Sequence, residues 1–448
     1  MKISVLTAVA FSLMILTTGC IEPENPYTAV APGIWRAVLR LEPRYITPNP
    51  KGEPLPEKMN MEFEPVTDGE LPFLMDVVYD NETDFHIDII NGEERIRLDD
   101  IIIGRNRATA KDTIRIDFPV YDTYISAIFE ANVMEGTWHD PARGNYTVPF
   151  VAKFGDGYRF TRLRKEPSVD ITGKWEVTFG IDGEKPYPAI GEFVQKGNDV
   201  TGTFRTETGD YRYLAGTIQY NSEKNYNKLY LSTFDGSHAF LFEAKVTDDL
   251  KMIGTFKSGT HYEATWEASK NDNAVLTDPN ELTFLNEGYE TLEFAFDNPE
   301  GKSVSPQNPE YAGKVRLIQI LGTWCPNCRD ETAFLTEYLS EHPDLDVEVI
   351  ALAFEKYKDK DRADQKVRKY KEKMNIPYEM VVAGPSKKSE AAKVLPALNH
   401  VLSYPTLIFM DKAGKIRRIH TGFSGPATSE YAGFVKEFDT LIRELAAE

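Results

Sequence analysis

The chain has 448 residues and carries 70 acidic against 51 basic side chains, which gives a formal net charge of −19 at pH 7. A chain of this length has room for about two to four domains with ample cores. The negative charge disfavours nucleic acid and anionic membrane surfaces as partners, because both are themselves negative.

The first twenty residues have the pattern of a secretory signal. Lys2 precedes an apolar run, Ile3 to Leu16, and small residues lead to Cys20; the run is too short for an ordinary membrane span. The stretch LTTGC resembles a bacterial lipobox, although its Leu stands one position further from the cysteine than usual. The resemblance implies a signal peptide at 1–19, acylation of Cys20, a tether at 20–32, and a lipid-anchored protein of the periplasm. The alternative is a soluble secreted protein in which Cys20 has no role.

Residues 33 to 270 have the character of antiparallel β structure. They are rich in Thr, Tyr, Phe and Val, with Gly, Asp and Asn at the turns, which is the composition of strands and hairpins. Apolar and polar residues alternate clearly, for example over 200–206 and 263–268, as in half-buried strands. We find no catalytic signature in this region comparable with the one described below.

The same region has the pattern of a duplication. Three sequence blocks occur twice in the same order. In the two copies Trp35 corresponds to Trp175, Phe129 to Phe242, and Met134 to Met252. We predict two related β units, 33–165 and 166–270, followed by a linker at 271–284. The Gly-x-Trp and Gly-Thr-aromatic blocks resemble those of lipocalin-like barrels, in which the first and last strands pair. We expect both tryptophans in the core, with contact to a ligand as the alternative.

The other two cysteines belong to the stretch WCPNC, Trp324 to Cys328. The apolar run at 314–321 predicts a buried strand before them, and apolar spacing over 327–341 predicts a helix after them. A helix N-terminus carries partial positive charge and unpaired N–H groups, and CxxC cysteines there have pKa values lowered from about 8.5 to about 3.5–7.5. We therefore expect Cys325 to attack a disulfide and Cys328 to resolve the mixed disulfide.

Two other uses of the cysteine pair are disfavoured. A zinc site needs four ligands, and the sequence offers neither a second CxxC nor a nearby pair of histidines, so we expect no metal. A disulfide within CxxC closes too short a loop to stabilise the fold much. With these two uses disfavoured, we expect the two cysteines to be chemically reactive.

Strands and helices alternate after the CxxC motif, which favours a three-layer α/β domain. The expected strands are 347–354, 378–383, 406–410 and 415–420, and the expected helices are 361–375, 389–400 and 430–447. WCPNC is followed by Glu331, and Tyr404-Pro405-Thr406 precedes a strand. With these motifs, residues 285–448 resemble the thioredoxin fold, and more closely the TlpA/ResA group of membrane-tethered thiol-disulfide oxidoreductases.

The resemblance assigns further site residues. Trp324 and Pro326 complete the WCxxC motif. Tyr404, Pro405 and Thr406 correspond to the cis-proline loop, which in the family packs against the cysteines and presents backbone to a substrate peptide. A cis X–Pro bond is a minority state, about 5–6% of such bonds in folded proteins, and the alternative here is an ordinary trans proline at a strand edge.

Proton transfer is expected to depend on Glu331. Cytoplasmic thioredoxin has a buried Asp on the strand, at the place of Gln319 in this sequence. Gln319 cannot titrate, so the proton of Cys328 is expected to pass to Glu331, as the resemblance to TlpA/ResA implies. The alternative is that Glu331 is a first-turn acid favoured by the helix dipole.

Two neighbouring groups fit the motif less well. Peroxiredoxins place a lone peroxidatic cysteine after a Pro and a Thr, a pattern that is missing here. Copper chaperones of the same fold use CxxxC and a distant His; the spacing differs, although His400 and His420 exist.

We therefore predict a multidomain protein: two antiparallel β units, barrel- or sandwich-like, followed by a thioredoxin-like domain. The expected function is disulfide exchange with protein substrates and a redox partner, through a Cys325–Cys328 redox disulfide and without a cofactor. The competing hypothesis is a lipoprotein whose β units bind a ligand or partner, with an accessory or inactive thioredoxin-like domain.

Overall fold

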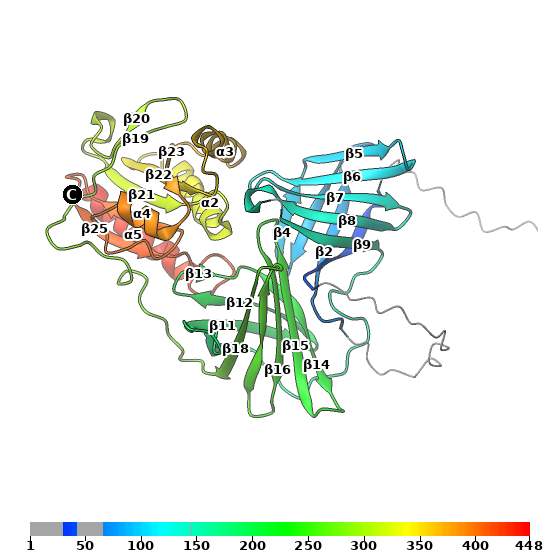
Figure 1. Ribbon diagram of the computed structural model, residues 1–448. Helices are drawn as coiled ribbons and strands as arrows, with labels where there is room; N and C mark the ends of the chain where they lie inside the picture. Colours follow the sequence, from blue (N-terminus) through cyan, green and yellow to red (C-terminus); the bar gives the residue numbers. More distant parts are fainter. Residues whose placement is uncertain (1–29, 43–65, 145) are drawn as a thin grey trace, which may run out of the picture.

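The computed structural model describes residues 30–42, 66–144 and 146–448. The predicted signal peptide, Cys20 and most of the predicted tether lie outside these residues. Figure 1 shows three bodies in chain order: a β sheet in blue and cyan, a β barrel in green, and an α/β domain in yellow to red. The predicted fold class, two antiparallel β units followed by an α/β domain, is confirmed.

The first β unit is an antiparallel meander of nine strands. They are β1 (Gly33–Arg40), β2 (Glu70–Tyr79), β3 (Phe85–Asn91), β4 (Glu94–Leu98), β5 (Ile101–Asn106), β6 (Lys111–Phe118), β7 (Thr123–Glu130), β8 (Val133–Asp140) and β9 (Tyr146–Phe154), with a 3-10 turn η1 (Pro141–Arg143) before β9. The order is β4-β3-β2-β1-β9-β8-β7-β6-β5, so the first and last strands pair. Among the described strands no ladder joins β4 to β5, and the unit is a half-barrel.

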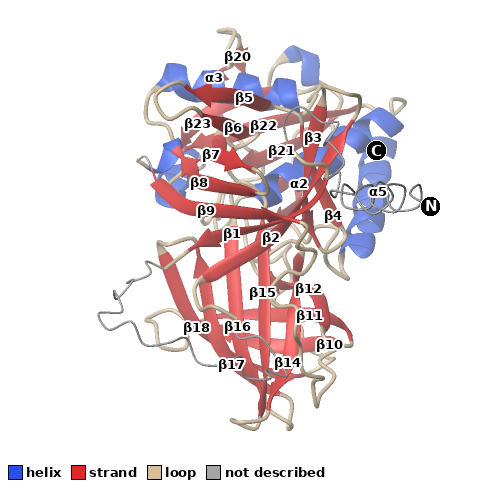
Figure 2. Cartoon of the chain, turned by 90° about the vertical axis from the view of Figure 1, so that its right-hand side faces the viewer, coloured by secondary structure: helices blue, strands red, loops and turns tan. Residues whose placement is uncertain are grey.

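The second β unit is a closed barrel, seen below the half-barrel in Figure 2. Its strands are β10 (Gly173–Phe179), β11 (Tyr187–Lys196), β12 (Asp199–Thr206), β13 (Gly209–Asp210), β14 (Leu214–Asn221), β15 (Tyr226–Phe234), β16 (Ala239–Val246), β17 (Lys251–Ser258) and β18 (Tyr262–Lys270). Ladders β10–β18 and β11–β12 close the ring. Aromatic rings fill its interior, among them Phe179, Phe204, Phe242, Phe256 and Trp266. First and last strands thus pair in both units, as the lipocalin-like pattern predicted.

The two units repeat local features that the sequence comparison pointed to. Trp35 and Trp175 are fully buried, and each indole N–H donates to the carbonyl four residues earlier, over 2.9 and 2.8 Å. The ladder register, however, does not match Phe129 with Phe242. Phe242 lies opposite Phe256, whereas the residue opposite Trp138 is Ile125. When the Gly-Thr-aromatic blocks of the two units are matched, Phe242 therefore corresponds to Ile125 and not to Phe129.

The two β units share part of one core. Phe234, at the end of β15, lies with its ring centroid 4.6 Å from that of Phe73, 5.4 Å from Phe118 and 5.3 Å from Trp138. These three partners belong to the half-barrel, whose core also includes Leu241 of β16. Strands of the barrel therefore bury apolar surface of the half-barrel, and the two units pack as one body.

The C-terminal domain is a mixed five-stranded sheet with helices on both faces, in the order β23-β22-β21-β24-β25. Its elements are β19 (Phe296–Asp297), β20 (Ser303–Val304), η2 (Pro309–Tyr311), β21 (Val315–Leu321), α2 (Pro326–Glu341), β22 (Val347–Glu355), α3 (Lys360–Lys373), β23 (Glu379–Pro385), α4 (Lys388–Val394), β24 (Thr406–Met410), β25 (Ile416–Thr421) and α5 (Tyr431–Ala447). Every residue of β21 is buried, as a central strand requires. Helix α4 ends at Val394 and not at His400, because Pro396 disfavours helical backbone in the residue before it.

The α/β domain is docked on both β units. Helix α3 lies beside the half-barrel (Figure 1), where Asp122 accepts ion pairs from Lys366 at 3.2 Å and Lys369 at 2.6 Å. Lys373 pairs with Asp100 of the half-barrel at 2.9 Å. The barrel contacts the same domain through β13, beside the chain that follows β25.

Candidate active site

The two predicted cysteines lie where β21 ends and α2 begins. Cys325 is the N-cap residue of α2, and Pro326 follows as the first helical residue. The backbone N–H of Cys328 donates a hydrogen bond to Cys325 Sγ over 3.3 Å. First-turn N–H groups have no partner inside a helix, and together with the helix dipole they stabilise negative charge. The start of α2 therefore presents a hydrogen-bond donor to Cys325 Sγ.

The two thiols differ in solvation. Both are free in the structure, but Cys325 is 8% exposed whereas Cys328 is fully buried. Burial raises the pKa of the Cys328 thiol well above its usual value, and the neighbouring Cys325 and the charge of Glu331 raise it further. Cys328 therefore keeps its proton until a base removes it.

The predicted cis-proline loop lies against Cys325. The Tyr404–Pro405 peptide bond is cis, and the thiol of Cys325 lies 3.4 Å from the carbonyl oxygen of Tyr404, within reach of donating to it. Thr406 Oγ1 donates to the carbonyl of Ser403 over 3.0 Å, across the proline. The structure thus brings together the CxxC motif and the Tyr-Pro-Thr loop, which stand about eighty positions apart in the sequence.

Glu331 points into the domain and not into solvent. Its side chain is fully buried, and Oε2 accepts a hydrogen bond from Gln319 Nε2 over 2.9 Å. Within the described residues Oε1 has no hydrogen-bond partner. Burial raises the pKa of this carboxyl to about 8, although the bond from Gln319 lowers it. Gln319 is in turn fixed by Tyr378, whose hydroxyl donates to its carbonyl oxygen over 3.3 Å.

Comparisons with known proteins match the same third of the chain. Residues 288–419 match the AhpC/TSA family. The thioredoxin-like protein YneN of Bacillus subtilis is 26% identical over 138 residues, 31% of this chain and 73% of that protein. The thiol-disulfide oxidoreductase ResA of Bacillus thuringiensis is 26% identical over 129 residues, 29% of this chain and 66% of ResA. This C-terminal domain is TlpA/ResA-like.

Solved structures that resemble this chain cover about a third of it. A thioredoxin-like protein from Porphyromonas gingivalis is 26% identical and covers 35% of this chain and 91% of its own, with a TM-score of 0.27. A thiol-disulfide oxidoreductase from Bacteroides fragilis is 22% identical and covers 34% of this chain and 99% of its own, with a TM-score of 0.26.

Two charged residues beside the TlpA/ResA-like motif were not predicted as part of the site. Glu355, at the end of β22, is buried and accepts hydrogen bonds from the backbone N–H and the hydroxyl of Thr323, both over 2.9 Å. Lys356 Nζ lies 4.9 Å from the centroid of the Trp324 ring, and burial lowers the pKa of this amine to about 8. Nothing in the local sequence pattern distinguishes Glu355 from the strand that it ends, or Lys356 from the charged helix that follows.

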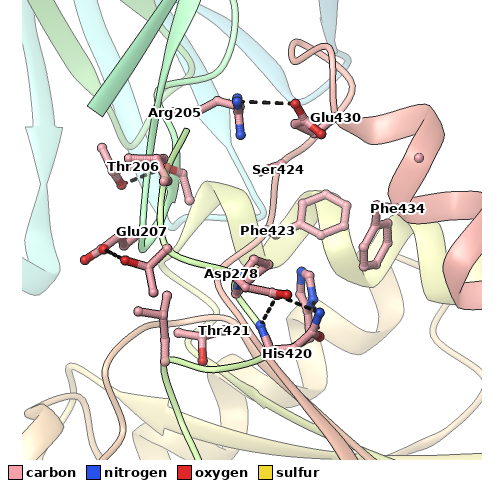
Figure 3. Close-up of a pocket in the computed structure, with 18 of the residues that line it drawn as sticks. Arg205, Thr206, Glu207, Asp278, His420, Thr421, Phe423, Ser424, Glu430 and Phe434 are labelled. Atoms are coloured by element: carbon pink, nitrogen blue, oxygen red, sulfur yellow. Dashed lines mark hydrogen bonds and ion pairs between the residues drawn. The ribbon is translucent and has the colours of Figure 1, made fainter. Parts of the chain in front are cut away.

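His420, one of the two histidines considered for metal delivery, lines a cavity that does not include the thiols. The cavity has a volume of about 300 Å³ and lies between the end of β12, the linker and the start of α5 (Figure 3). The ring of His420 lies 3.2 Å from the side-chain oxygen of Asn280. No group of His, Cys, Asp and Glu side chains within 30–42, 66–144 and 146–448 has the arrangement of a metal site.

Proposed function

We propose that this chain is an envelope thiol-disulfide oxidoreductase that exchanges disulfides with protein substrates through Cys325 and Cys328. The observation that carries the proposal is the placement of Cys325 Sγ between a helix N–H and the carbonyl of Tyr404. A thiolate at this position can attack a disulfide while backbone of the cis-proline loop is available to a substrate chain.

In the first step the thiolate of Cys325 attacks one sulfur of a substrate disulfide. The substrate S–S bond breaks, a new S–S bond joins Cys325 to the attacked sulfur, and the other substrate sulfur leaves as a thiolate that takes a proton from water. Trp324 and Pro326 shape the surface around the attacking sulfur, and Tyr404 and Thr406 hold the loop opposite it.

In the second step Cys328 resolves the mixed disulfide. Its thiol gives a proton to ionised Glu331, and its sulfur attacks Cys325 Sγ. The mixed disulfide breaks, the Cys325–Cys328 disulfide forms, and the remaining substrate sulfur leaves as a thiolate. Two electrons pass from the dithiol to the substrate, and the reverse sequence oxidises a substrate dithiol. A base is needed because the pKa of buried Cys328 is raised.

The proposed envelope location rests on the N-terminal sequence. Acylation of Cys20 would attach the chain to a membrane and leave the domains outside the cytoplasm. Within the part of the chain that the structure describes, no helix is long and apolar enough to cross a membrane. We assign 33–165 and 166–270 to the two β units, 271–284 to the linker and 285–448 to the redox domain.

The direct test is reduction of insulin by the purified chain in the presence of a dithiol reductant. The Cys325→Ser variant should lose this activity. If the native chain does not reduce insulin or oxidise a reduced substrate, the alternative is favoured, in which the β units bind a partner and the redox domain is inactive. Titration against glutathione then gives the direction of electron flow, since related CxxC proteins range from about −270 to −120 mV.

A further inference from the structure

One hairpin lies at the end of the barrel sheet. The first half of β12, Asp199 to Gly202, pairs with β14, but Arg205 and Thr206 pair with the short strand β13. Residues 206–212, here called the docked hairpin, therefore continue past the end of the β12–β14 ladder. Figure 1 places β13 against the α/β domain, and in Figure 3 Thr206 and Glu207 of the barrel line the same cavity as Phe423 and Ser424 of the α/β domain.

The docked hairpin binds the segments that surround the thiols. Ser403, which precedes the cis-proline loop, donates to the carbonyl of Thr208 over 2.7 Å. Asn327, within the CPNC loop, donates through Nδ2 to the carbonyl of Asp210 over 3.0 Å. The backbone N–H of Gly425 donates to the carboxylate of Asp210 over 2.6 Å. Two backbone carbonyls and one carboxylate of the docked hairpin are thus held by the active-site domain.

Close approach of the two backbones makes the contact specific. Gly209 is buried and has φ of +128°, and a Cβ built there would lie 2.7 Å from Asn327 Nδ2. Gly422 faces it from the other domain, where a Cβ would lie 2.9 Å from the carbonyl carbon of Thr208. Any side chain at these positions would overlap with the opposite domain, so the present fit depends on glycine at both.

The segments that the barrel contacts lie on either side of the nucleophile. A second segment of the barrel reaches the motif, where Ser237 Oγ donates to the carbonyl of Trp324 over 3.0 Å. In this arrangement Cys325 is 8% exposed. The attack requires direct contact of the two sulfurs, so a substrate chain has to approach Cys325 beside the residues that the barrel now binds, which are Trp324, Asn327 and Ser403.

We infer that the docked hairpin occupies the surface on which protein substrates bind, and that a substrate must displace it to reach Cys325. This inference rests on the proposed oxidoreductase function. The partner that this surface fits is an extended chain segment that offers two backbone carbonyls, an acidic side chain and a basic side chain. Ser403, Asn327 and Gly425 now hold the first three groups, and Asp330 of α2 holds the fourth, which is Arg212 of the docked hairpin. The β units thereby act as an internal competitor of the substrate.

The test is Gly209→Ala in the full chain carrying Cys20→Ser, which retains only Cys325 and Cys328. The matched control is Gly197→Ala, in the β11–β12 turn, where φ is also positive but a Cβ would meet nothing within 4 Å. Labelling of the reduced thiols with a large polyethylene glycol maleimide reports whether the site is open, independently of any enzymatic activity. A second variant, Asp210→Asn, removes the carboxylate charge and keeps the size of the side chain.

We expect Gly209→Ala to label at least about tenfold faster than the native chain and the control, because steric overlap disfavours the docked state. Insulin reduction should rise in the same variant. Equal labelling rates in the native chain, Gly209→Ala and Asp210→Asn would overturn the inference even if insulin is reduced. Faster labelling without insulin reduction in any of these chains would instead overturn the proposed oxidoreductase function.

Discussion

Glu331 has the surroundings of a proton acceptor and not those of a surface helix residue. It is fully buried, holds one hydrogen bond from Gln319, and leaves one oxygen without a partner among the described residues. The first turn of α2 holds no acidic residue, so Glu331 is not the first-turn acid that the helix dipole would favour. Cys328 is buried beside it, and the charge of Glu331 contributes to the raised pKa of that thiol. The two groups therefore influence each other's protonation.

Replacement of Glu331 by Gln should slow resolution by Cys328 and leave the first attack by Cys325 largely intact. Only the ionised carboxylate accepts a proton, and its pKa is raised to about 8, so the resolution rate of the native chain should increase as the pH rises through about 8. The variant should lose this increase. Single-turnover disulfide exchange between about pH 5 and 9 measures both steps. An unchanged pH profile in Glu331→Gln would exclude Glu331 as the acceptor.

The same burial makes the stability of the domain depend on pH. A carboxyl whose pKa is raised from 4.5 to about 8 on folding stabilises the folded state below pH 4.5, and this contribution is lost as the pH rises through about 8. The slope is at most about 1.4 kcal/mol per pH unit for one group. Urea unfolding should show Glu331→Gln with a flatter decline than the native chain over this range. Parallel curves would contradict the raised pKa.

The two cysteines should differ in their reactivity toward alkylating reagents. Cys325 has the helix N–H and some exposure, whereas Cys328 is buried with a raised pKa. Iodoacetamide at about neutral pH should therefore modify Cys325 much faster than Cys328, since the thiolate is the reactive form. Cys328→Ser should accumulate mixed disulfides with substrate, which non-reducing electrophoresis detects. Equal alkylation of both thiols would argue against these roles.

At the scale of elements, the sequence predicted best where one local pattern decides the structure. The apolar run of β21 followed directly by CPNC places Cys325 at a helix start, and the structure agrees. The predicted helix extended beyond the observed end of α4, because the helical spacing of the sequence continues past Pro396. That proline disfavours helical backbone in the residue before it. The docked hairpin gives no signal in sequence, since a Gly-Asp dipeptide such as Gly209-Asp210 reads as an ordinary turn. Contacts between distant segments decide its position.

The shared core of the two β units should be sensitive to Phe234. Replacement by Ala removes a ring that packs on Phe73, Phe118 and Trp138, and a buried Phe→Ala change commonly costs about 3–5 kcal/mol. The control is Phe284→Ala, at a side chain that is 57% exposed, where the cost should stay within about 0.5 kcal/mol. Denaturant unfolding measures both. Similar costs for the two variants would mean that the units do not depend on a common core.

At the scale of the molecule, one buried arginine connects all three bodies. Arg212 of the barrel is 2% exposed and forms ion pairs with Glu94 of the half-barrel, Asp330 of α2 and, at 3.4 Å, Asp235 of its own barrel. It also donates to the carbonyl of Pro326 over 3.4 Å. A single arginine before β14 carries no sequence signal for such a role, because its partners come from three separate parts of the chain.

Replacement of Arg212 by Gln should therefore uncouple the bodies. The change leaves buried carboxylates without their cation, and breaking a buried ion pair in this way costs about 3–5 kcal/mol. Calorimetry of the native chain should show the redox domain and the β units unfolding together, whereas the variant should show the redox domain as a separate transition at its own temperature. The control is Arg97→Gln, an exposed pair with Asp99 at 2.8 Å, which should change stability by less than about 1 kcal/mol. A single transition in Arg212→Gln, shifted no further than in the control, would mean that the charge cluster does not hold the redox domain on the β units, and that their apolar and backbone contacts are sufficient to do so.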